Sequence, residues 1–483
     1  MNATLVTDTP SFLATRRGKL TLTLLCAVAF LDFVDSSIVN VALPTIQREL
    51  RLPVPTLQWV TSGYLLTYGG LMLLGGRLAD LLGRRRVLIL GTVIVGVSSA
   101  FGGMAHSSGL LIGARFAQGV GAALMLPAAL SILTTSFREG SDRHTALSVW
   151  GGAAGLASAA GVFLGGVLTQ GPGWRWVFYV NTPVCVLALA AVPALLPNDR
   201  RNEIRSGFDV LGTALATGGL MLLVYGLVKA PDQGWGSTRT IVELAVATAL
   251  LAAFVVNERY TANPLVPLSI FRIRGLAAAD ITHLILAAGM LAMFFFVTLY
   301  MQEVLRYGEF EAGSAYLPLS LTVGMAAGVV AKIFPRTGTR PVIVVGSLIS
   351  AAGVILLSRL PIGGSYAKDL LPGMLIMAVG LGAVFVANTT AANAGVPAEQ
   401  AGLAAALLNT AQQIGGALGI AVLTAIATSR TNDQLAQGHN PIDSMTSGFR
   451  YGLLIGGLIA LAGAVAALWT ANSRGEEPAR SRL

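Results

Sequence analysis

Fourteen long apolar stretches dominate this sequence. A helix needs about 20 mostly apolar residues to cross the roughly 30 Å hydrocarbon core of a bilayer. The sequence therefore predicts an all-α polytopic membrane protein with fourteen spans. We expect these spans at residues 20–43, 57–75, 87–104, 109–134, 145–168, 176–197, 208–229, 240–256, 275–301, 312–333, 341–359, 370–394, 401–428 and 448–471.

The composition excludes a soluble protein. Hydrophobic residues make up 54% of the 483 residues and charged residues only 11%, whereas soluble domains carry about 25% charge. The net charge of +9 would suggest nucleic acid in a soluble protein. In a membrane protein Lys and Arg instead face anionic lipid from cytoplasmic loops. We expect no nucleic-acid partner. The two Cys and four scattered His residues predict no metal site and no cofactor.

The distribution of Lys and Arg between the loops predicts the orientation. With the N-terminus inside, 21 of the 32 Lys and Arg residues fall in inside segments and 10 in outside segments. Because cytoplasmic loops are enriched in these residues, we expect both termini in the cytoplasm. The expected location is the cell membrane, and in particular a bacterial inner membrane.

A weak internal repeat divides the chain into two halves. Residues 76–86 read GRLADLLGRRR, and residues 331–341, after the tenth predicted span, read AKIFPRTGTRP. This match makes the first six and the last six spans equivalent. Two parallel halves around a midplane site form a transporter architecture. The predicted organisation is a cytoplasmic segment 1–19, a six-helix bundle 20–197, two inserted helices in 198–256, a cytoplasmic connector 257–274, a six-helix bundle 275–471 and a cytoplasmic tail 472–483.

The short loop between the second and third predicted spans carries the strongest motif. A carboxylate there can lie at a helix N-terminus or pair with a nearby Arg. A positively charged membrane anchor would explain the arginines, but it explains neither Asp80 nor the glycines. The residues of interest in this loop are Gly76, Arg77, Asp80, Gly83, Arg84 and Arg85.

This loop resembles the signature loop of the major facilitator superfamily. RFAQGVGAA at 115–123 resembles the helix-4 motif of that superfamily, and DSSIVNVALP at 35–44 resembles the helix-1 motif of its fourteen-span drug:proton antiporter family. The segments WVTSGYLL from Trp59, WRWVFYVNTP from Trp174 and LLNTAQQIGGALG from Leu407 are also similar to that family. The resemblance implies a major-facilitator fold and a proton-coupled transporter that exports drugs or an antibiotic-like natural product. It further implies that the signature loop controls the change between conformations.

The fifth predicted span departs from the antiporter pattern. The family's motif usually reads G-P-x-x-G-G, and here the segment reads GVFLGG. Val162 stands where Pro is expected, so the kink that Pro introduces is absent. Gly161, Gly165 and Gly166 remain and predict close packing of this helix.

Two acids on the first span are candidates for proton coupling. Asp32 and Asp35 lie three residues apart and share a helix face. A charge near the bilayer centre costs about 2.5–3.5 kcal/mol, so such residues are functional candidates. At 1.5 Å per residue, Asp35 and Arg115 of the fourth span lie at similar depths, which permits an ion pair. Either Asp35 exchanges a proton when its surroundings change, or the pair is a static link between helices.

A second pair of residues in the ninth predicted span has the same spacing. Asp280 and His283 also lie three residues apart on one helix face. They form either a second proton site or a hydrogen-bonded structural pair, and the sequence leaves both readings open.

Polar and aromatic side chains in several spans are candidates for lining a substrate cavity. A largely apolar cavity with few polar anchors suits hydrophobic or cationic organic molecules. We expect such small molecules, protons and the lipid bilayer as partners of a monomer. Symport of a small organic solute is the alternative, and a membrane receptor or enzyme is the alternative from another class. The candidate lining residues are Asn40, Trp59, Tyr64, Gln118, Asn409 and Gln412.

Overall fold

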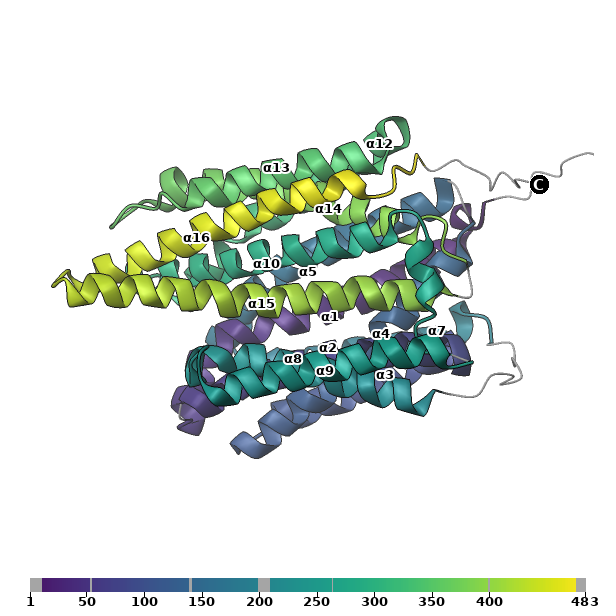
Figure 1. The fold of residues 1–483 in the computed structure, drawn as a ribbon, viewed down its shortest axis with the longest axis horizontal. Coiled ribbons are helices and arrows are strands. Elements are labelled where there is room, and N and C mark those ends of the chain that lie inside the picture. The colour runs from purple at the N-terminus through teal and green to yellow at the C-terminus, as the bar shows by residue number, and fades with distance from the viewer. Residues whose placement is uncertain are drawn as a thin grey trace, which may run out of the picture.

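The computed structural model describes residues 11–52, 54–138, 141–198, 209–262, 264–397 and 400–474. In these ranges the chain is mainly helical and contains no strand. The long helices run side by side along the longest axis of the molecule (Figure 1). Thirteen segments of the described chain are long and apolar enough to cross a membrane. The predicted all-α polytopic membrane fold is therefore confirmed.

Sixteen α-helices are present in the described ranges. The helices up to residue 260 are α1 (Arg16–Leu50), α2 (Val54–Leu82), α3 (Arg84–Gly103), α4 (Ser108–Ser136), α5 (Ser141–Gln170), α6 (Trp176–Tyr179), α7 (Asn181–Leu195), α8 (Val210–Gln233) and α9 (Thr238–Tyr260). The later helices are α10 (Leu276–Leu299), α11 (Glu309–Ser314), α12 (Leu317–Thr337), α13 (Thr339–Leu357), α14 (Leu371–Asn393), α15 (Ala401–Ala436) and α16 (Pro441–Ala466).

The fifth predicted span, 145–168, lies within α5. This helix has 30 residues, which corresponds to about 45 Å, but its candidate apolar stretch is the shorter Ala160–Gln170. Each of the other predicted spans overlaps one of the thirteen candidate spans. The count of fourteen spans therefore stays a prediction.

Several helices extend beyond the predicted spans. Helix α1 has 35 residues and continues to Leu50, whereas its predicted span ends at residue 43. Hydropathy identifies only the part of a helix that lies among the lipid tails. Polar residues allow the same helix to continue into the headgroup region and into water.

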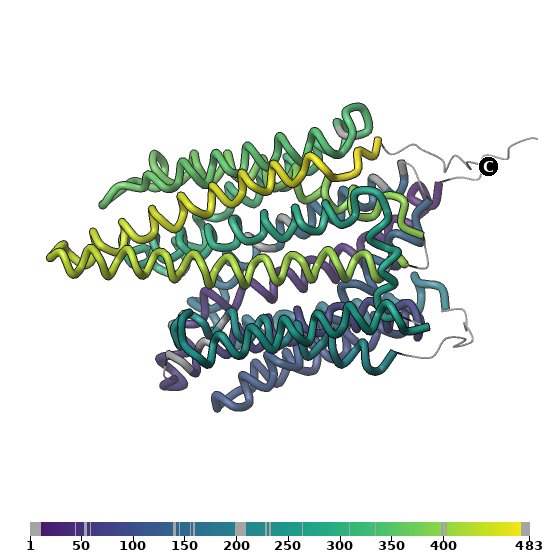
Figure 2. Tube along the Cα trace, in the orientation of Figure 1, coloured from purple at the N-terminus to yellow at the C-terminus, as the bar shows by residue number. Residues whose placement is uncertain are grey.

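The helices form two bundles that meet along two seams (Figure 1). At one seam α2 packs against α15, and α8 packs against both of them. At the other seam α5 packs against α11, α12 and α14. Figure 2 shows α8 and α9 as a teal helical hairpin beside the lower bundle. The first of the two inserted helices thus contacts both bundles.

The two loops of the internal repeat share an uncommon backbone conformation. Gly83 precedes α3 with a φ of 103°, and Gly338 precedes α13 with a φ of 90°. Residues with a side chain rarely adopt such angles, whereas Gly does so at little cost. The repeat therefore preserves the turn from which a helix begins, although Asp80 in the first loop is matched by Pro335 in the second.

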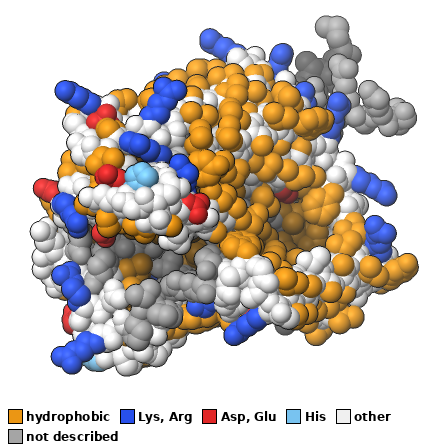
Figure 3. Space-filling model, turned by 60° about the vertical axis from the view of Figure 1, so that its left-hand side comes forward, with side chains coloured by type: hydrophobic (Ala, Val, Ile, Leu, Met, Phe, Trp, Pro, Cys, Tyr) orange, Lys and Arg blue, Asp and Glu red, His pale blue; other side chains and the backbone are white. Residues whose placement is uncertain are grey.

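The molecular surface is strongly apolar. Figure 3 shows a broad area of hydrophobic side chains on one face, with Lys and Arg gathered toward its margins. Leu187 is 70% exposed, Val210 69% and Leu321 62%. Large exposed apolar patches are rare on soluble proteins. Such patches are stable when they contact lipid tails. The surface thus agrees with an embedded protein.

Helix contacts inside the bundles depend on glycine. A Cβ atom added at Gly75 on α2 would lie 1.9 Å from the carbonyl oxygen of Ala123 on α4, whereas one added at Gly218 on α8 would meet nothing within 4 Å. We expect Gly75→Ala to lower the free energy of unfolding by about 1–3 kcal/mol, as overpacking does. Gly218→Ala should leave it unchanged or raise it, because Ala favours a helix over Gly. Thermal denaturation of the detergent-purified variants checks this, and equal stabilities would contradict the close contact.

Candidate functional site

The side chains of Asp35 on α1 and Arg115 on α4 form a buried ion pair. Arg115 Nη1 lies 2.8 Å from Asp35 Oδ2, and neither side chain is more than 3% exposed. Arg115 Nε donates to the backbone oxygen of Val60 at 2.8 Å, and the guanidinium carbon lies 4.3 Å from the ring centroid of Tyr64. The pair is removed from water and joins α1 to α4.

Neutral side chains complete the hydrogen bonding of Asp35. Gln118 Nε2 donates to Asp35 Oδ1 at 3.2 Å and to Ser99 Oγ at 2.8 Å. Gln118 Oε1 in turn accepts from Arg115 Nη1 at 3.0 Å. Asn181 Nδ2 donates to the same Asp35 oxygen as Gln118. A buried charge is tolerated when it is paired and hydrogen-bonded, and Asp35 meets both conditions as a carboxylate.

Asp32, one turn earlier on α1, has different surroundings. It is 3% exposed and accepts from Tyr64 Oη at 3.1 Å and from Tyr68 Oη at 2.6 Å. Within the described chain, no Lys or Arg forms an ion pair with it. Asp32 can therefore gain or lose a proton without breaking an ion pair, whereas Asp35 cannot.

A very small cavity, which we call the central cavity, lies between the two bundles. Its volume is about 10 Å³, which is room for about one water molecule. Its walls come from α1, α4 and α5 on one side and from α10, α14 and α15 on the other. Drug-sized ligands need about 300–1,000 Å³, so binding one here requires the bundles to separate. The lining residues are Phe33, Leu130, Trp150, His283, Phe385, Thr389, Leu408, Asn409 and Gln412.

His283 lies in this wall between two amide side chains. Its Nδ1 atom lies 3.2 Å from Asn388 Nδ2, and its Nε2 atom lies 3.3 Å from Gln412 Oε1. Asn388 Nδ2 also donates to the backbone oxygen of Ala279 at 3.1 Å. With Asn388 as donor and Gln412 as acceptor, the contacts fit a neutral imidazole that carries its proton on Nε2.

Asp280 does not share a hydrogen bond with His283. Both of its carboxylate oxygens are buried, and neither has a hydrogen-bond partner within the described chain. A buried carboxylate without a partner is costly, and inside a membrane such a residue is a candidate functional site. Among the described residues, Asp280 and His283 therefore do not form the hydrogen-bonded pair that their spacing allowed.

Only two of the candidate cavity residues line the central cavity. These are Asn409 and Gln412, both on α15. Tyr64 and Gln118 lie instead in the buried cluster around the acids of α1. Candidates from different helices reached different environments because the sequence gives depth but not the direction in which a helix face points.

The remaining two candidates, Asn40 and Trp59, also lie away from the central cavity. Asn40 is exposed, and its Oδ1 atom accepts from Thr61 on α2 at 3.4 Å. The Trp59 ring stacks on Phe116 and on Tyr225, with ring centroids 6.1 and 5.7 Å apart. Trp59 therefore joins α2 to α4 and α8 in this conformation.

The signature loop links the two bundles. The Asp80 carboxylate on α2 lies 3.6 Å from Arg84 Nη2 at the start of α3. It also interacts with the charge of Arg77 and with the backbone of Leu403 in the first turn of α15. Because a helix N-terminus attracts negative charge, Asp80 connects α2 with the beginning of a helix in the other bundle.

Three other residues of the signature loop lie within the N-terminal bundle. Gly76 is buried within α2, and Gly83 forms the turn before α3. Arg85 donates to Asn198 Oδ1 after α7. These contacts lie within the N-terminal bundle, whereas the contact of Asp80 with Leu403 reaches the C-terminal bundle.

We expect Asp80→Asn to slow transport about tenfold while substrate affinity stays unchanged. Losing a charged hydrogen-bond partner costs about 1.5–3 kcal/mol, and this loss applies only to the conformation in which α2 touches α15. Initial efflux rates and equilibrium binding on the same purified variant check the expectation. Asp433→Asn, at an exposed position, is the control. A normal transport rate for Asp80→Asn would contradict this role.

The glycines of α5 face α1. A Cβ added at Gly161 would lie 2.0 Å from Ser37 Oγ, and one at Gly165 would lie 2.6 Å from a carbonyl oxygen of α1. Gly166 is buried. Val162 instead packs against the core of the C-terminal bundle. The position where the motif expects Pro thus lies at the seam between the bundles.

Two of the residues that complete the buried cluster, Asn181 and Ser99, were not candidates from the sequence. Asn181 contacts Asp35, Tyr68 contacts Asp32, and Ser99 accepts from Gln118. Asn181 lies in the segment WRWVFYVNTP, so the family motif could have identified it. No sequence feature marked Ser99 as a site residue, because a Ser hydroxyl in an apolar helix usually hydrogen-bonds to the backbone of its own helix.

Comparison with known proteins gives the family. The family model of the Major Facilitator Superfamily matches residues 25–420. The chain is 37% identical to the puromycin resistance protein pur8 of Streptomyces alboniger over 462 residues, covering 94% of this chain and 92% of pur8. It is 37% identical to the cephamycin export protein CmcT of Amycolatopsis lactamdurans over 86% of each chain. The solved structure of the human organic anion transporter MFSD10 (TETRAN) has a similar fold, with a TM-score of 0.66, 15% identity and coverage of 94% of this chain and 100% of that one.

The family matches also settle the broad class of the protein. The thirteen candidate spans of the described chain and the bacterial relatives identify a multi-pass protein of the bacterial plasma membrane. Its family and relatives are transporters, which confirms that it is not an enzyme. The resemblance read from the motifs is confirmed, and this chain belongs to the major facilitator superfamily.

Proposed function

We propose that this chain exports hydrophobic or cationic organic molecules, including antibiotic-like natural products, in exchange for protons. The observation that carries the proposal is the pair of buried acids on α1. Asp35 is held by Arg115, while Asp32 has no cationic partner within the described chain. Intramembrane acids are costly and mark proton or ion pathways.

Asp32 is the proton carrier in this proposal. A protonated carboxyl donates one hydrogen bond where the carboxylate only accepts. Protonation of Asp32 would therefore rearrange its bonds to Tyr64 and Tyr68, which come from α2. Asp35 and Arg115 stay paired and hold α1 against α4. The sequence favoured Asp35 as the proton carrier. The contacts favour Asp32, because its protonation leaves the ion pair between Asp35 and Arg115 intact.

The transport step follows from the contact between the bundles. The next residue after Asp32, Phe33, lines the central cavity, so the proton site and the substrate site share a helix. The cavity is nearly closed in this conformation, and Asp80 holds α2 near α15. Substrate binding and release would therefore require the two bundles to rock around their central contact.

The substrate class and direction are inferred from the relatives. Pur8 is named for puromycin resistance and CmcT for cephamycin export. We extend export of small organic molecules from these proteins to this chain. Five of the nine residues in the wall of the central cavity are apolar, and this supports the inference because mostly apolar walls with a few polar groups suit organic compounds. Symport of a small solute is the alternative.

The test is a panel of antibiotics and dyes in a pump-deficient bacterial strain. Cells that express this chain should retain less compound than cells that express Asp32→Asn at the same protein level. An uncoupler should remove the difference, because the proposed driving force is the proton gradient. Equal retention across the whole panel would contradict the proposed export.

We also propose fourteen spans, cytoplasmic termini and a monomer. The charge distribution of the loops supports the orientation. A cysteine at position 481, in a tail that lies outside the described residues, should react with an impermeant maleimide only after permeabilisation. Labelling of intact cells at that position would contradict the orientation of the C-terminus.

A further inference from the structure

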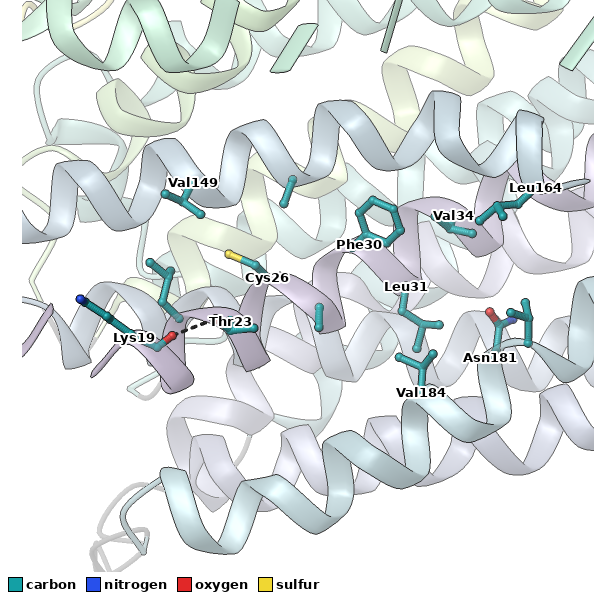
Figure 4. A pocket seen from close by; sticks show the side chains of 14 residues that line it. Lys19, Thr23, Cys26, Phe30, Leu31, Val34, Val149, Leu164, Asn181 and Val184 are labelled. Atoms are coloured by element: carbon teal, nitrogen blue, oxygen red, sulfur yellow. Dashed lines mark hydrogen bonds between the residues drawn. The ribbon is translucent and has the colours of Figure 1, made fainter. Parts of the chain in front are cut away.

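A groove on the outer side of the N-terminal bundle is separate from the central cavity. It has a volume of about 700 Å³, which lies within the range of about 300–1,000 Å³ for small-molecule pockets. Figure 4 shows α1 residues from Lys19 to Val34 between side chains of α5 and α7. At 1.5 Å per residue this part of α1 is about 22 Å long. The groove is therefore long enough for an extended amphiphilic molecule.

The wall of the groove is almost entirely apolar, with a polar group at each end. The lining residues between the ends include Ala27, Phe30 and Leu31. Lys19 lies at one end and Asn181 at the other. The central cavity contains neither of these polar residues. No residue lines both sites.

Asn181 has an oxygen atom without a partner. The side chain is fully buried, and its Nδ2 atom donates to Asp35. A carboxylate accepts hydrogen bonds, so the nitrogen of the amide must face Asp35 and the oxygen must face away. That oxygen is buried and has no hydrogen-bond partner within the described chain. An unsatisfied buried acceptor is unfavourable, and a donor supplied by a ligand would remove that cost.

We propose that this groove binds an uncharged amphiphilic organic molecule that carries a hydrogen-bond donor. Its apolar body lies along α1 between α5 and α7, and its donor bonds to Asn181 Oδ1. A lipid acyl chain could fill the same space but has no donor at that depth. Lys19 gives the groove a positive charge, which disfavours a permanent cation. Because Asn181 also bonds to Asp35, the occupant would contact the polar network of the ion pair.

The test uses two fluorescent probes that differ only in whether the amine nitrogen carries a hydrogen or a methyl group. N-phenyl-1-naphthylamine is uncharged and has one N–H donor, and its N-methyl derivative has none. We expect the first probe to bind the full-length protein in nanodiscs about tenfold more tightly than the second, since one unsatisfied acceptor is worth about that factor. Empty nanodiscs correct for partition into lipid. Equal affinities would mean that the groove holds only an apolar chain, and would overturn the proposal.

A second measurement locates the bound probe. Ala27 lines the groove and is exposed, so Ala27→Trp should fill the groove without disturbing the core. Ala190 on α7 is also exposed but does not line the groove, so Ala190→Trp is the matched control. Binding of the N–H probe should weaken at least about tenfold in the first variant only. Unchanged binding in Ala27→Trp would overturn the location. The assay involves no transport, so its failure leaves the proposed function untouched.

Discussion

Replacing Arg115 by alanine is expected to lower the free energy of unfolding by about 3–5 kcal/mol, because it leaves the buried carboxylate of Asp35 without its cation. Neither partner is more than 3% exposed, so water cannot take the place of the guanidinium. Gln118 and Asn181 still donate to Asp35, but two neutral donors do not balance a full charge. Thermal denaturation of the detergent-purified variant measures the loss.

A double-mutant cycle separates the ion pair from the other contacts of Arg115. Asp35→Asn removes the charge that Arg115 compensates, so the double variant should be more stable than the sum of the two single losses predicts. The control is Arg239→Ala, which breaks the Arg239–Glu243 pair on α9, where the Arg side chain is 65% exposed. Exposed pairs contribute about 0–1 kcal/mol. Additive losses for Asp35 and Arg115 would contradict the ion pair.

The second large effect is expected from Asp32→Asn. Asn keeps the size of the side chain and can still hydrogen-bond to Tyr64 and Tyr68, but it cannot carry a proton. One charge moved through 100 mV is worth about 2.3 kcal/mol, so one proton exchanged for a neutral substrate could sustain a gradient of roughly fifty-fold. We expect the variant to insert and bind substrate normally and to lose this accumulation entirely.

Accumulation of ethidium in inverted membrane vesicles tests the same loss of coupling. Because ethidium carries one positive charge, its exchange for one proton moves no net charge and is driven by the pH difference. The vesicles expose the cytoplasmic face, so an exporter should concentrate the dye inside when the lumen is acidic. Asp433→Asn, at an exposed position on α15, should behave like the unmodified protein. If Asp32→Asn still concentrates the dye, the proton site lies elsewhere, and the unpartnered carboxylate of Asp280 becomes the next candidate.

The sequence predicted the fold well because the bilayer imposes a simple rule of length and hydropathy. Each predicted span except 145–168 overlaps a candidate span, and α5, which contains that segment, still has 30 residues. Helix ends were less predictable: α1 continues to Leu50, since a helix in the headgroup region no longer needs apolar side chains.

The candidate site could be predicted in part. Depth along a helix can be counted, so the sequence permitted an ion pair between Asp35 and Arg115, and the structure has one at 2.8 Å. The sequence does not show in the same way toward which neighbouring helix each face of a helix points. His283 therefore bonds to Asn388 and Gln412 in the structure and not to Asp280, although the spacing had suggested the nearer residue.

Partners that come from distant segments were the least predictable. Asn181 reaches Asp35 from a helix 146 positions later in the chain, and only the packing of α7 beside α1 brings them together. The same packing creates the groove with the unpartnered oxygen of Asn181. A sequence motif can mark Asn181 as a candidate, but it does not show which distant side chain Asn181 contacts.

The most direct test of proton exchange is the pH inside inverted vesicles that contain this protein. With an acidic lumen and no voltage, ethidium is added to the exposed cytoplasmic face, and a trapped pH indicator reports the lumen. Exchange predicts that the dye enters while protons leave, so the lumenal pH rises, and that Asp32→Asn abolishes the rise. A fall in lumenal pH as the dye enters would mean that proton and dye move together, and would contradict exchange.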